Sequence, residues 1–153
     1  MPTLREAFAE RLKQALKARD ARTVSTVRLI LAALKERDVA ARGKGKLEAV
    51  SEAEIQQILQ AMIKQRRESI VLYDQGNRPE LAQRERDEIA VIESFLPRQF
   101  EEAEIDQAAS AIIAETGASG IKDIGKVMAA LRQRHAGVMD FARASAIVRR
   151  RLG

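Results

Sequence analysis

Apolar residues recur every three or four positions along most of this chain, and this spacing constrains the fold more than any other feature. Near the N-terminus Leu4, Phe8, Leu12 and Leu16 follow one another at intervals of four, which places them on one side of a helix. Strong helix formers dominate the composition, whereas Thr, Tyr and Trp are scarce. The pattern predicts an all-α protein whose first helix runs from about Leu4 to Ala18.

Three more long helices are expected before residue 97. Capping residues, glycines and prolines predict them from after Asp20 to about Ala41, from the Ser51 cap to Gly76 and from Pro79 to Leu96. The first two should form a hairpin, because the wide apolar face of the second suits a central position. The run Arg42-Gly43-Lys44-Gly45-Lys46 reads as an exposed connection, which could also contact phosphates.

The sequence around Pro97 predicts a domain boundary. The residue before a proline is pushed out of the helical conformation, and the helices expected beyond this point are shorter. One should be closed by Gly117, a second should run from Lys122 to Arg134, and a third from Phe141 to Leu152 after an Asp140 cap. We therefore predict an N-terminal long-helix domain, residues 1–96, followed by a small three-helix C-terminal domain, residues 97–153.

Composition excludes several classes of site. The chain has no cysteine, so disulfides, thiolate zinc sites and cysteine nucleophiles are ruled out. The single histidine, His135, sits at an expected helix end with no second metal ligand or nucleophile nearby in sequence, so we expect no metal, no cofactor and no catalytic residue. No stretch reaches the roughly 18 apolar residues of a membrane span, and the N-terminus does not resemble a signal peptide, so a cytoplasmic protein is expected.

Two short runs concentrate positive charge in a chain with a formal net charge of +5. In the first, Lys122 and Lys126 are four apart, so they should share one helix face with Gly125 beside them and let a polyanion backbone approach. The alternative is that Gly125 packs against a neighbouring helix while the lysines are merely solvated, because glycine inside a helix costs about 1 kcal/mol relative to alanine.

The second run places Arg66 and Arg67 on the third helix, with Tyr73 two turns further on. A guanidinium that grips phosphate would make this a second candidate surface. The ordinary alternative is an arginine stacked on Tyr73 or paired with Glu68 or Asp74. The C-terminal arginines at positions 149–151 are open to two interpretations as well, since cations stabilise a helix C-terminus and also bind phosphate.

Several ordered motifs at characteristic separations resemble the YqeY family, also called GatB/YqeY-like, over nearly the whole chain. The residues that carry the resemblance are Thr26-Val27-Arg28-Leu29-Ile30, Ala32-Ala33-Leu34-Lys35, Gln65-Arg66-Arg67-Glu68-Ser69-Ile70, Tyr73, Gly76-Asn77-Arg78, Leu81-Ala82, Glu88-Ile89, Phe95-Leu96-Pro97-Arg98-Gln99 and Lys122-Asp123-Ile124-Gly125-Lys126-Val127-Met128. The chain departs from many relatives between Ala136 and Phe141, where Gly137 and Asp140 remain but an intervening cation is missing.

The resemblance implies a small helical C-terminal domain similar to the tail of the B subunit of the glutamyl/aspartyl-tRNA amidotransferase, a tRNA-binding attachment without catalytic residues. It suggests a stand-alone accessory protein that binds tRNA, in which Lys122 and Lys126 contact phosphates and Gly125 permits close approach. We add Arg132 and Arg143 as further candidate phosphate contacts. An aminoacyl-tRNA-related enzyme is a possible partner, and neither DNA nor a membrane is expected. Two alternatives stay open: a protein-interaction adaptor, and participation in carbon-nitrogen ligase activity with glutamine as amido-N-donor.

Overall fold

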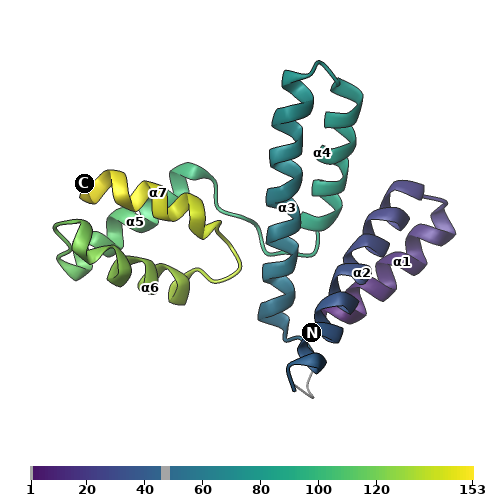
Figure 1. Cartoon of the computed structure of the whole chain (residues 1–153), viewed down its shortest axis with the longest axis horizontal. Helices are drawn as coiled ribbons and strands as arrows, with labels where there is room; N and C mark the ends of the chain where they lie inside the picture. Colours follow the sequence, from purple (N-terminus) through teal and green to yellow (C-terminus); the bar gives the residue numbers. More distant parts are fainter. Residues whose placement is uncertain (1, 46–48) are drawn as a thin grey trace. The chain divides into compact units, whose positions relative to one another are not determined.

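The computed structural model describes residues 2–45 and 49–153, and within these ranges it contains helices and no strand (Figure 1). The all-helical prediction is confirmed. The predicted contact loop Arg42 to Lys46 ends at Lys46, which lies outside the described residues. The elements are α1 Leu4–Ala18, α2 Ala21–Gly43, α3 Glu52–Gln75, α4 Pro79–Glu93, α5 Glu102–Thr116, the 3₁₀ turn η1 Ile121–Asp123, α6 Ile124–Arg134 and α7 Phe141–Leu152.

Contacts between residues divide the chain into two compact units, residues 1–96 and 97–153. Each has its own hydrophobic core. The first unit consists of two helix pairs, α1 with α2 and α3 with α4, with further contacts between α2 and α4. The second unit consists of α5, α6 and α7, each of which packs against the other two.

The first unit buries one apolar stripe from each helix. Phe8 of α1 is fully buried and its ring meets that of Phe95 edge-on, with 4.8 Å between the centroids. The helix starts follow the predicted caps: Thr3 and Glu6 form a reciprocal capping box, and the Ser51 hydroxyl accepts a hydrogen bond from the Glu54 amide. These caps satisfy amide groups that would otherwise lack partners at a helix start.

The predicted end of the fourth helix is wrong by three residues, since α4 ends at Glu93 rather than at Leu96. The backbone tightens there into turns in which the Phe95 and Leu96 amides donate to carbonyls three residues back. The Ser94 hydroxyl also donates to the Val91 carbonyl, which competes with helix continuation. The second helix runs two residues beyond the predicted Ala41.

In the second unit Gly117 closes α5 as predicted, with a φ of 67° in the left-handed region that glycine tolerates. The Asp140 carboxylate caps α7 as predicted, since it accepts hydrogen bonds from the amides of Ala142 and Arg143. The predicted start of the middle helix is corrected: Lys122 lies in η1, and α6 begins at Ile124.

Candidate nucleic-acid interface

The exposed face of α6 carries two small residues, Gly125 and Ala129, and two cations, Lys126 and Arg132. Gly125, Ala129 and Arg132 are exposed, and at about 100° per residue they fall on one stripe. Lys126 is exposed beside that stripe, while Val127, Met128 and Leu131 fill the core on the opposite side. The helix therefore presents a low strip of backbone at Gly125 and Ala129, with Arg132 further along the same strip and Lys126 to one side of it.

Gly125 does not pack against a neighbouring helix, so that part of the alternative is wrong. A Cβ built on its backbone meets no atom within 4 Å apart from its own helix backbone. The glycine thus lowers helix stability although no described residue approaches closely enough to require the missing side chain. What remains beside it is open surface.

The two lysines are exposed and have no carboxylate within ion-pair distance in the described part of the chain. The Lys126 ammonium lies 3.5 Å from the Thr116 carbonyl oxygen. Asp123 lies between Lys122 and Lys126 in sequence, but its carboxylate accepts a hydrogen bond of 3.0 Å from the Ser119 amide. Hydrogen bonds from backbone amides, with a smaller contribution from both lysines, hold the pKa of Asp123 below its ordinary value. That carboxylate stabilises the turn before α6.

The other two predicted contact residues lie in different surroundings. The Arg132 guanidinium lies 5.7 Å from the centre of the Phe141 ring, which holds it at the surface of α6. Arg143 comes from α7 and lies 3.7 Å from the Glu102 carboxylate of α5. Phosphate binding by Arg143 would therefore compete with an existing ion pair, whereas Lys122 and Lys126 have no such competitor.

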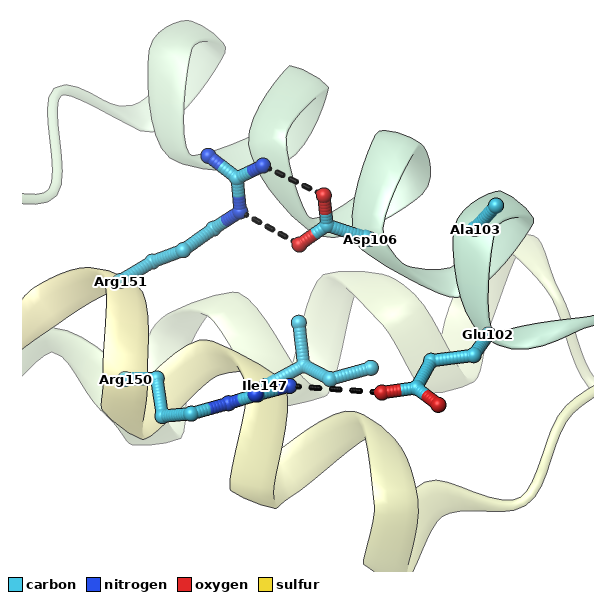
Figure 2. Close-up of a pocket in the computed structure, with 6 residues that line it drawn as sticks. All are labelled: Glu102, Ala103, Asp106, Ile147, Arg150 and Arg151. Atoms are coloured by element: carbon cyan, nitrogen blue, oxygen red, sulfur yellow. Dashed lines mark hydrogen bonds and ion pairs between the residues drawn. The ribbon is translucent and has the colours of Figure 1, made fainter.

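Two of the three C-terminal arginines, Arg150 and Arg151, pair with acidic residues of α5, which sequence reasoning missed. Figure 2 shows the Arg151 guanidinium facing the Asp106 carboxylate, with two hydrogen bonds of 2.8 and 2.6 Å, and Arg150 directed at Glu102 at 3.5 Å. These contacts border an open pocket of about 470 Å³. The Arg151 guanidinium lowers the pKa of Asp106. Opposite charges 45 positions apart give no signal in a single sequence.

The second candidate surface is largely occupied by ion pairs. Arg66 donates to Glu88 at 2.9 Å, and only 12% and 9% of the two side chains are exposed. Arg67 pairs with Glu93 at 3.1 Å. The predicted local partners of these arginines are wrong, because both carboxylates come from α4. Tyr73 is half-buried, and no cation–π contact to it exists among the described residues.

Three further observations concern His135, groups of metal ligands and membrane-spanning helices. His135 caps the end of α6, and its ring lies 5.1 Å from that of Phe100. Within residues 2–45 and 49–153 no group of three acidic or histidine side chains is placed to hold a metal ion. In the same ranges no helix combines the length and apolarity needed to cross a bilayer.

Comparison with known proteins adds the family. Residues 5–152 match the family described as Yqey-like protein. The chain is also 32% identical, over 106 residues, to "Altered inheritance of mitochondria protein 41, mitochondrial" from Lachancea thermotolerans. That alignment covers 68% of this chain and 54% of the relative, so the match spans about half of the relative's length. Because the family match takes in nearly the whole chain, the protein belongs to the YqeY-like family.

Proposed function

We propose that the protein is a non-catalytic accessory module that binds tRNA through the α6 face of its second unit. The observation that carries this proposal is the open backbone at Gly125 on α6, with exposed Lys126 next to it in the helix and exposed Lys122 in the preceding turn η1; neither lysine has a carboxylate partner among the described residues. A glycine that lowers helix stability, together with lysines that form no ion pair, fits a ligand outside the chain. A ligand rich in phosphates fits this combination of charge and close backbone access.

The composition of this face favours recognition of shape and charge over recognition of bases. Phosphate contacts carry no sequence information, and A-form RNA is read mainly through its backbone and its 2′-hydroxyl groups. The chain has one tyrosine and four phenylalanines, and Phe8 and Phe95 pack in the core of the first unit. Stacking of unpaired bases on aromatic rings should therefore contribute little.

Fluorescence anisotropy of labelled tRNA, titrated with the protein over a series of salt concentrations, tests the proposal. The variant Lys122→Ala/Lys126→Ala should bind more weakly. Its log–log salt slope should be flatter by about 0.7 to 0.9 for each phosphate group that the variant no longer neutralises. The matched control is Lys13→Ala/Lys17→Ala, which removes two exposed lysines at the same spacing from α1.

The control variant should bind tRNA as the unaltered protein does. Equal losses of affinity in both variants would show that only overall charge matters, and no saturable binding at low salt would rule out the proposal. A DNA duplex of similar length serves as the competitor, and it should displace tRNA poorly if the A-form backbone is what the face recognises.

A further inference from the structure

The first unit contains an open groove of about 740 Å³ that the proposed tRNA site does not use. Residues from the end of α1, the start of α2 and α4 line it, and Figure 1 shows that the α1–α2 pair diverges from the α3–α4 pair toward the α1–α2 turn. Leu16 and Leu29 line it while 51% and 47% exposed, and Val24 lies between them in sequence. Neighbouring aliphatic side chains left in water mark a contact surface more than scattered ones do.

The same groove carries an excess of positive charge. Arg19 and Arg28 line it, both are exposed, and neither has a carboxylate within ion-pair distance in the described part of the chain. Arg84 lies 3.7 Å from Glu88, the single acidic residue in the described lining. Because the Glu88 carboxylate also binds Arg66 at 2.9 Å, it cannot neutralise the arginines around the groove.

We propose that this groove binds an amphipathic helix of a partner protein, whose apolar side chains cover Leu16 and Leu29 and whose Asp and Glu residues pair with Arg19 and Arg28. Helices commonly dock an apolar stripe into such grooves. Guanidinium groups bind carboxylates through two parallel hydrogen bonds, so the unpaired arginines select an acidic helix. A nucleic acid fits less well, because the groove is aliphatic and its described lining offers no aromatic ring for a base.

A phage-displayed library of random 16-residue peptides, selected on the full chain, tests this inference without a known partner. Enriched peptides should carry Leu, Ile or Met at positions i, i+3 or i+4, and i+7, with Asp or Glu on the flanks. A synthetic copy of the most enriched peptide, labelled with a fluorophore, should bind Arg28→Glu at least about tenfold more weakly than the unaltered protein. Leu29→Ser should weaken it as well.

The matched control is Arg37→Glu, on the same helix but about 180° away from Arg28 and also exposed. It should bind the peptide normally. Absence of enrichment, enrichment of basic or uncharged peptides, or equal binding by Arg28→Glu would each overturn the inference. Displacement of the peptide from the groove by tRNA would also overturn it. So would displacement of the peptide by phosphatidylglycerol vesicles whose binding depends on Arg28. Apart from competition by tRNA, none of these results bears on the Lys122 and Lys126 variants, so the two proposals can fail separately.

Discussion

Replacing Gly125 with alanine should strengthen the fold and weaken tRNA binding at the same time. Gly125 is helical, lies in the first turn of α6, and leaves space in which an added Cβ meets nothing within 4 Å. An alanine there lowers the backbone entropy of the unfolded chain without a clash. We expect a gain of about 0.5 kcal/mol in the free energy of unfolding, the low end of the usual range because the first turn is less demanding than a helix interior.

The loss of affinity follows from the approach distance. A methyl group stands about 1.5 Å off the Cα, so a phosphate seated on the bare backbone must retreat by a similar distance. Moving one unit charge from about 4 to about 5.5 Å from an ammonium lowers the attraction from about 4 to about 3 kcal/mol at an effective dielectric constant of about 20. A difference of about 1 kcal/mol corresponds to roughly fivefold weaker binding.

Two measurements on the full chain separate these effects. Amide hydrogen exchange at Val127 and Met128 should slow by about twofold in Gly125→Ala, because opening of α6 costs about 0.5 kcal/mol more. Anisotropy with labelled tRNA should report the weaker binding. Gly43→Ala is the matched control, since Gly43 ends α2 and likewise has nothing within 4 Å of a built Cβ. Its affinity for tRNA should not change.

A gain in stability combined with a loss of tRNA affinity is what we expect if Gly125 serves binding and not folding. A Gly125→Ala variant that is stabilised but binds tRNA with unchanged affinity would refute close approach at this backbone. A variant that is destabilised would refute the open surface itself. Equal losses of stability and affinity would indicate a purely structural glycine, because a fold defect lowers both.

Three further predictions concern the ion pairs and one helix end. Glu88→Gln should lower the free energy of unfolding by about 2 kcal/mol in urea titrations, because it leaves the largely buried Arg66 with Glu85 alone at 3.8 Å; an unchanged midpoint would contradict it. The Arg98 guanidinium and the Glu101 amide lower the pKa of Glu104 to about 2, so this carboxylate contributes stability above its ordinary pKa of 4.5 and loses it as the pH falls toward 2. Arg98→Gln should move that NMR titration back toward 4.5, and a titration still near 2 would refute the assignment. Gly117→Ala should destabilise the second unit by about 1 kcal/mol in thermal melts, since φ is 67° there, and an unchanged melting temperature would show that the left-handed cap is not needed.

Helix starts are predictable because their signals are local. The capping box of Thr3 and Glu6, the Ser51 cap and the Asp140 cap each act over two or three residues, and the structure contains all of them. Two predicted helix boundaries are wrong because local signals do not decide between an α-helical and a 3₁₀ turn. The end of α4 and the start of α6 differ from expectation where short turns of the 3₁₀ type replace the last or first helical residues, and that choice depends on small differences in hydrogen bonding.

Partners across helices are not predictable from one sequence. The sequence suggests Glu68 or Asp74, on the same helix, as ordinary partners of Arg66, yet Arg66 binds Glu88, 22 residues away. Leu16 continues the stripe formed by Leu4, Phe8 and Leu12, yet about half of it is exposed in the structure. Periodicity shows which face a residue occupies, and tertiary packing decides whether that face is covered.

The groove of the first unit and the α6 face of the second unit have one property in common: each includes residues whose placement costs stability. At Gly125 the chain gives up helix stability, and at Leu16 and Leu29 it leaves apolar area in water, and neither feature is balanced by a contact among the described residues. An accessory module that joins an RNA to a protein needs two such surfaces with different chemistry, one for phosphates and one for an acidic apolar helix. If both titrations succeed, tRNA and peptide should bind the same molecule without competition, which a single shared site cannot produce.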